Sequence, residues 1–189
     1  MQIEFTKNKL GKILMEARSH LKESAPLSKI ILDVTGYHLK GRLIKKLSEV
    51  SKMFRSPLHG IDHWKRVEKN GLNLSQFTNA DTDIVTCFAY LHDCMRMNEN
   101  RDLEHGKRGA EYARKLRSDI IDLTDDQFEI LFFACEWHTK GKHTDNITIA
   151  TCWDADRLDL GRVGIIPSEK YLLTNEAKRI ANKLDPYSS

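Results

Sequence analysis

The amino-acid sequence predicts an all-α fold, built as a helical bundle. Two observations favour this fold. The 189 residues include only four prolines, and apolar side chains recur at intervals of three and four positions along most of the chain, which is the period of an amphipathic helix. A chain of this length can bury a sizeable core. We therefore expect one main helical domain.

The first three helices of this domain are expected over about residues 39–54, 61–74 and 82–97. The first has an apolar face of leucines and ends before Pro57, a residue that cannot continue a helix. The third has the most apolar inner face, which consists of Ile84, Phe88, Leu91 and Met95.

Three longer helices and a short C-terminal one follow. The first of these begins after Asp102 and carries small residues that permit close helix contact, namely Gly109, Ala110 and Ala113. Thr124 and Gln127 have the spacing of a capping box, the reciprocal hydrogen-bond motif of a helix N-terminus. They mark the start of the next helix. Another is expected over about residues 147–160, and Thr174 is a candidate cap for the last.

The expected domain organisation is a helical domain over residues 37–189 with an N-terminal extension over residues 1–36. We expect the extension to be helical, with a break at Pro26. The segment after this proline fits either a helix or a short strand. Two roles fit the extension as a whole, a further helix of the bundle and a dimer contact, so a homo-oligomer is compatible with the sequence.

Composition and charge narrow the classes of function. The net charge is only +3, with both signs interleaved, so nucleic acid and membrane surfaces are not indicated as partners. The chain has no apolar run of the roughly 20 residues that span a bilayer, and its start lacks the apolar core of a signal peptide. The four cysteines are scattered without a CxxC pair, which is typical of buried, reduced thiols. We expect a cytoplasmic protein.

His92 and Asp93 stand side by side in the apolar run FAYLHDCM. Burial of a carboxylate costs several kcal/mol unless it is paired or binds a metal. A single histidine on an apolar stripe is usually a satisfied core residue, but here five consecutive predicted helices each offer a His or Asp. Such positions converge inside helical bundles. Imidazoles and carboxylates without thiolates favour Mn, Fe, Ni, Co or Zn. The candidate ligands are His63, His92, Asp93, His105, His138 and one of Asp154 and Asp156, while His59 could be a ligand or could orient one.

Three stretches, HGIDHWKRV, AYLHDCMR and DADRLD, resemble in their order the HD-domain superfamily of metal-dependent phosphohydrolases. The resemblance covers roughly residues 55–162. It implies an HD-type helical bundle with a metal site between the helices, and it assigns as ligands His63, His92, Asp93 and Asp156. Asp156 is preferred over Asp154 because the family's ligand directly precedes the basic residue of this element. The two aspartates also point about 200° apart on a helix.

The order of His105 and His138 is similar to that of the dinuclear members of the superfamily, in which Asp93 would bridge two ions. The chain departs from the best-known dinuclear branch at Trp137-His138, where that branch has two adjacent histidines. The sequence therefore predicts one or two divalent transition-metal ions. With a single ion, His105 and His138 would instead contact the substrate's phosphate.

The resemblance implies hydrolysis of a nucleotide or another small phosphate ester by a metal-activated water. Asp93 and Arg96 are the candidate catalytic residues, and the candidates for binding the substrate's phosphate are Arg96, Lys107 and Arg157. Two other functions remain open. Some dinuclear HD proteins resemble this pattern and are di-iron oxygenases, and a degenerate HD domain would act as a non-catalytic sensor or interaction module.

Overall fold

The computed structural model of the protein describes residues 27–117 and 119–184, with side chains from residue 39 onward. The chain divides into two compact units, residues 1–42 and 43–189. The expected helix before Pro26 lies outside the described residues. The stretch that follows this proline is helical, so the helix is the alternative that holds there.

The described residues form α-helices and two short 3₁₀ helices, without a strand among them, which confirms the all-α prediction for this part of the chain. None of the helices in the described ranges is long and apolar enough to cross a membrane. In chain order the elements are α2 (Leu27–Val50), α3 (Ile61–Thr78), α4 (Thr82–Leu91), α5 (His105–Leu116), α6 (Asp125–Trp137), α7 (Ile147–Arg157), η1 (Leu158–Val163), η2 (Glu169–Tyr171) and α8 (Asn175–Leu184).

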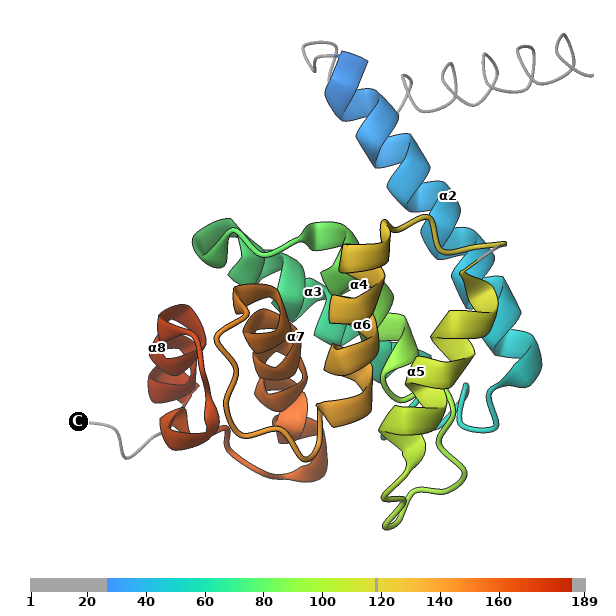
Figure 1. The fold of residues 1–189 in the computed structure, drawn as a ribbon. Coiled ribbons are helices and arrows are strands. Elements are labelled where there is room, and N and C mark those ends of the chain that lie inside the picture. The colour runs from blue at the N-terminus through green and yellow to red at the C-terminus, as the bar shows by residue number, and fades with distance from the viewer. Residues whose placement is uncertain (1–26, 118, 185–189) are drawn as a thin grey trace, which may run out of the picture. The chain divides into compact units, whose positions relative to one another are not determined.

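Within the second unit, α4 lies at the centre of the bundle (Figure 1). It packs against α3, α6 and α7, while α5 covers α6 and α8 lies against α3. Every residue of α4 from Ile84 to Leu91 is buried except Thr86. This explains its nearly continuous apolar sequence, because a helix that has neighbours on all sides has no solvated face.

Side-chain caps fix where several helices begin. Thr124 and Gln127 form the predicted capping box at the start of α6. Thr174 accepts a hydrogen bond from the backbone of Ala177 at the start of α8, as its position predicted. Asp81 caps α4 and Asn146 caps α7 in the same way. These caps satisfy backbone N–H groups that have no partner inside the helix.

The helix expected to reach residue 160 ends as an α-helix at Arg157, where η1 follows. Two other helices end at least four residues earlier than the sequence predicted. The helix expected to reach residue 54 ends at Val50, and the helix expected to reach residue 97 ends at Leu91. At the second end, the imidazole of His92 donates to the carbonyl groups of Phe88 and Ala89. The Ala89 carbonyl would accept the N–H of Asp93 in a continued helix, so the histidine competes with the helix. The chain then continues in tight turns.

Candidate metal centre

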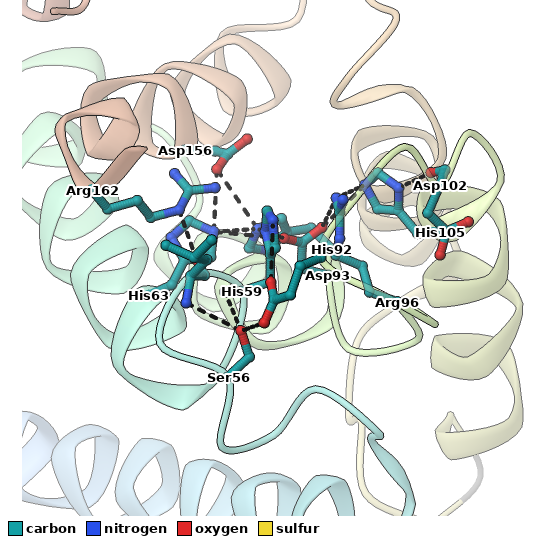
Figure 2. A network of polar contacts seen from close by, with 12 residues as sticks. Ser56, His59, His63, His92, Asp93, Arg96, Asp102, His105, Asp156 and Arg162 are labelled. Carbon is teal, nitrogen blue, oxygen red and sulfur yellow. Dashed lines mark hydrogen bonds and ion pairs between the residues drawn. The ribbon is translucent and has the colours of Figure 1, made fainter. Parts of the chain in front are cut away.

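The six candidate ligands lie at or near the ends of α3, α4, α5, α6 and α7. Figure 2 labels five of them, all except His138. His63 is in the first turn of α3, and His92 and Asp93 directly follow α4. His105 is the first residue of α5. The remaining two are His138, directly after α6, and Asp156, near the end of α7. All are buried except Asp156, which is partly exposed.

His63 and His92 form the first ligand group together with Asp156 and Oδ2 of Asp93. The Nε2 atoms of the two histidines lie 3.1 Å apart. Asp156 Oδ1 is 3.4 Å from the Nε2 of His63 and 3.8 Å from that of His92. Asp93 Oδ2 lies 3.8 and 3.9 Å from the same two nitrogens. Two carboxylate oxygens therefore lie within 3.9 Å of both Nε2 atoms, and the four ligand residues come from α3, from α7 and from the turn after α4.

The other ring nitrogen of each histidine is already engaged. His63 places its Nδ1 2.7 Å from Asp159 Oδ2, and His92 donates from Nδ1 to two backbone carbonyls. Because carboxylate and carbonyl oxygens only accept, both Nδ1 atoms carry the hydrogen. The neutral imidazoles then direct the lone pairs of Nε2 at each other. This arrangement is unfavourable unless a cation or an extra proton lies between them.

His105 and His138 form the second ligand group together with Oδ1 of Asp93. Their Nε2 atoms are 2.9 Å apart, and Asp93 Oδ1 lies 3.0 Å from the first and 3.6 Å from the second. Nδ1 of His105 donates to the Asp102 carbonyl, and Nδ1 of His138 donates to the Cys135 carbonyl. The second ligand group therefore repeats the arrangement of the first.

Asp93 has one oxygen in each group, and its environment fits a cation. Its Oδ1 is buried and receives no well-aligned hydrogen bond from any residue that the structure describes. A buried carboxylate oxygen left in that condition is costly. In the described ranges, three overlapping sets of side chains could each hold a metal ion, because the ligand atoms within each set lie within 4.8 Å of one another. The sets are His63, His92 and Asp93, then His92, His138 and Asp156, and finally Asp93, His105 and His138. The donor set is imidazole and carboxylate, which suits a divalent transition metal.

The electrostatics of the site keep the carboxylates ionised. Burial alone would raise the pKa of Asp93, but the neighbouring imidazoles of His92, His105, His138 and His59 hold it well below its usual range. The pKa of Asp156 is lowered by His63 and His92 despite burial. Burial lowers the pKa of His92 to about 3, so this imidazole is neutral. Anionic carboxylates and a neutral imidazole are the states that bind metals.

His63 and His138 differ from His92, because their pKa values are raised. Burial opposes protonation of His63, but hydrogen bonds to Asp156 and Asp159 outweigh it. Burial likewise lowers the pKa of His138, and Asp93 more than compensates. A proton on either imidazole would compete with a metal ion at the points where the ligand atoms converge.

Residues outside the six ligands hold the site in place. His59 Nδ1 lies 3.0 Å from Asp93 Oδ2, and its Nε2 faces Glu99 Oε2 at 3.7 Å. Ser56 donates to the other oxygen of Glu99. Neither Ser56 nor Glu99 had a sequence signal that marked it as part of the site, because the contact between them joins positions 43 residues apart.

On the opposite side of the first ligand group, Asp159 connects His63 to two arginines. Arg66 donates from Nε to Asp159 Oδ1 at 2.7 Å, and Arg162 Nη1 lies 3.9 Å from Oδ2. Arg162 also donates from Nε to the carbonyl of Leu58 at 2.8 Å. The sequence did not single out Arg162 as an orienting residue of the site.

The structure separates the two aspartates of the DADRLD stretch. Asp156 faces the first ligand group, as described above. Asp154 is fully buried elsewhere and accepts hydrogen bonds from the backbone N–H groups of Leu173 and Thr174, at the start of α8. Its role in the fold is therefore to attach the C-terminal segment to α7.

The basic candidates for substrate binding are placed differently from one another. Arg96 is buried beside the second ligand group, with Nη1 3.3 Å from His105 Nε2 and 3.6 Å from Asp93 Oδ1. Lys107 is exposed on α5. Arg157 donates to the carbonyls of Tyr171 and Gly141. Its guanidinium therefore links α7 to two segments of the fold.

Comparisons of the chain with models of known protein families, with curated proteins and with solved structures found no match.

Proposed function

We propose that this protein is a metal-dependent phosphohydrolase of the HD-domain type that acts on a nucleotide or another small phosphate ester. The observation that carries the proposal is the position of Asp93 between two pairs of histidines. One of its buried oxygens faces His63 and His92, and the other faces His105 and His138. The resemblance of the sequence motifs to the HD superfamily adds to this observation.

In this proposal His63, His92, Asp93 and Asp156 hold one ion, and the second ligand group holds a further ion or contacts the substrate. A bound divalent transition metal would supply an activated water near neutral pH and positive charge for phosphate oxygens. The protein itself orients the ligands. Carbonyls or Asp159 hold the Nδ1 protons of the histidines, which leaves Nε2 free on each ring.

Phosphoryl transfer also needs fixed positive charge near the phosphate oxygens. Arg96 is the basic side chain placed to provide it, because its guanidinium lies against the ligand groups and is held by the carbonyls of Asn98 and Asn100. An arginine held in this way presents its donors without further ordering. The partly exposed Asp156 is the ligand nearest to solvent, so we expect the substrate to approach from its side.

One observation favours a second candidate function, a di-iron oxygenase of the same superfamily. The two ligand groups share Asp93 and contribute two histidines each, which suits two iron ions as well as two ions of a hydrolase. Iron content and oxygen consumption separate the two functions. A hydrolase releases phosphate without consuming oxygen, whereas an oxygenase consumes oxygen only when iron and substrate are both present.

The first experiment is metal analysis of protein purified without chelator, followed by a chromatographic screen for hydrolysis products. The screen covers nucleoside monophosphates, nucleoside triphosphates and phosphodiesters, each with Mn²⁺, Co²⁺, Zn²⁺ or Fe²⁺. Asp93→Ala is the test variant, and Asp145→Ala is its matched control because Asp145 is an exposed carboxylate in a loop. We expect Asp93→Ala to lose bound metal and activity and to keep its helical content.

The expected activity disappears on chelation and returns with metal. Asp145→Ala should match the wild type in metal content and in rate. The proposal is contradicted if the fully loaded wild type hydrolyses none of the esters, or if Asp93→Ala keeps wild-type metal content.

A further inference from the structure

Arg96 occupies an unusual position for a substrate-binding arginine. Its side chain is buried, with 9% of the residue exposed. Nη2 donates to the Asn100 carbonyl at 2.9 Å, and Nε points to the Asn98 carbonyl at 3.4 Å. Nη1 is left to face the second ligand group, at 3.3 Å from His105 Nε2 and 3.6 Å from Asp93 Oδ1. The guanidinium therefore points at two of the atoms that would hold a second metal ion.

We infer that Arg96 is a built-in competitor of the second metal ion, so that the two ligand groups bind metal with unequal affinity. The guanidinium neutralises Asp93 Oδ1 and offers a hydrogen to the lone pair of His105. A divalent ion in the second ligand group has to displace the guanidinium or bear its repulsion. This inference rests on the metal-binding part of the proposed function and adds that the occupancy of the second ligand group is controlled by this arginine.

Charge and burial make the competition effective. A guanidinium carries a full positive charge in proteins. Two cations separated by a few ångströms in a poorly solvated site repel each other far more strongly than at a surface. The loop carbonyls hold Arg96 in place, so it does not swing away without loss of its hydrogen bonds.

The first ligand group does not experience the same competition. Its two neighbouring arginines, Arg66 and Arg162, contact Asp159 instead of the ligand atoms. Asp159 lies between them and His63 and compensates their charge. The first ligand group also has two carboxylates, Asp156 and one oxygen of Asp93, against one carboxylate oxygen in the second. We therefore expect the first ion to bind at His63, His92, Asp93 and Asp156.

The test is a titration of the metal-free full-length protein with Co²⁺, followed by visible absorption and calorimetry. The wild type should bind one equivalent tightly and a second at least tenfold more weakly. Arg96→Gln should improve the second affinity at least tenfold and change the first little. Lys115→Gln is the matched control, because Lys115 is an exposed lysine on α5, the helix that carries His105. It should behave like the wild type.

Two further variants make the result specific. Arg96→Lys keeps the charge but loses the fork of donors, so its second affinity should lie between those of the wild type and Arg96→Gln. His105→Ala in the Arg96→Gln background should abolish the gained second equivalent. The first affinity of each variant shows that the site has folded.

The inference is overturned if the wild type binds two Co²⁺ ions with affinities within threefold. It is also overturned if Arg96→Gln and Arg96→Lys bind the second ion no better than the wild type. Neither result depends on turnover. A protein that shows the expected binding constants but hydrolyses none of the esters would contradict the proposed function and still support the role of Arg96.

Discussion

Asp159 Oδ2 lies 2.7 Å from Nδ1 of His63 and determines which nitrogen of that ring faces the candidate metal centre. The two residues are 96 positions apart. Asp159 is itself fixed by Arg66 and Arg162, so the orientation of His63 depends on all three of these side chains. Carboxylates behind a metal-binding histidine raise its basicity and hold its tautomer.

The first prediction concerns this carboxylate. Asp159→Asn should weaken binding of the first divalent ion by about 10- to 100-fold, the usual effect of removing such a partner. The ligands remain, so binding should weaken without being lost. Arg66→Gln should have a smaller effect, because Arg162 still contacts Asp159. Calorimetric titration with Co²⁺ measures both variants. A wild-type affinity in Asp159→Asn would show that His63 needs no orienting partner.

The second prediction separates two aspartates that are two positions apart. Asp156→Ala should lose metal and keep its stability, because Asp156 faces the ligand atoms. Asp154→Ala should keep the metal stoichiometry and lose about 1–3 kcal/mol of unfolding free energy, since the N–H groups of Leu173 and Thr174 lose their buried acceptor. Urea unfolding and metal analysis on the same samples measure both effects. Each variant is the control for the other, and exchanged outcomes would reverse the assignment.

The third prediction is a pH dependence of metal affinity. The pKa values of His63 and His138 are raised above that of an ordinary histidine, by Asp156 and Asp159 for the first and by Asp93 for the second, against the opposing effect of burial. A raised pKa means that the proton competes with the metal at higher pH. Affinity should therefore be full above the raised pKa values. It should fall as the pH decreases through them, starting above about 6.5.

Co²⁺ titrations at a series of pH values test this dependence. His143→Ala is the control, because His143 is an exposed histidine in the loop before α7, and its pH profile should match that of the wild type. An affinity that stays constant from about pH 8 down to pH 6, the range in which histidines titrate, would mean that no imidazole proton is displaced on binding.

The fourth prediction concerns the close contact between α5 and the end of α4. A Cβ atom on Gly109 would lie 2.5 Å from the carbonyl oxygen of Leu91 and 3.1 Å from that of His92. Gly109→Ala should therefore push α5 away and cost about 1–3 kcal/mol of unfolding free energy, as overpacking of a tight contact does. Metal affinity should fall as well, because the displaced backbone carries His92.

Gly161→Ala is the matched control for this change, since a Cβ atom at Gly161 meets nothing within 4 Å. Its stability and metal affinity should stay close to those of the wild type. Thermal unfolding and Co²⁺ titration measure both variants. Equal stability of the two alanine variants would mean that the contact between α5 and the end of α4 is loose.

Much of the helical architecture could be predicted from the sequence because the signals are local. The capping box of Thr124 and Gln127 and the cap at Thr174 each involve residues three positions apart. The apolar period of α4 follows from its burial on all sides. The predicted end of α4 was wrong. The helix ends where the ring of His92 donates to backbone carbonyls, and a residue pattern does not reveal which acceptor a side chain binds.

The candidate site was predictable in its residue types and less so in its surroundings. An aspartate in an apolar run is a local sign of a required partner, and this sign drew attention to Asp93. The supporting contacts are not local. Arg162 reaches the Leu58 carbonyl across 104 positions, and Ser56 reaches Glu99 across 43. No periodicity relates such residues, so only the folded chain brings them together.

The contacts of His63 with Asp159 and of Leu58 with Arg162 also have a consequence for biosynthesis. A ribosome releases His63 long before Asp159 and Arg162, and long-range contacts of this kind form late in folding. The nascent chain therefore passes through a stage in which its first histidines are exposed to cellular metals without their orienting partners. In the proposed function, capture of a metal ion by the first ligand group would have to wait until Asp156 and Asp159 have emerged, so metal content would report that the chain has folded to that point.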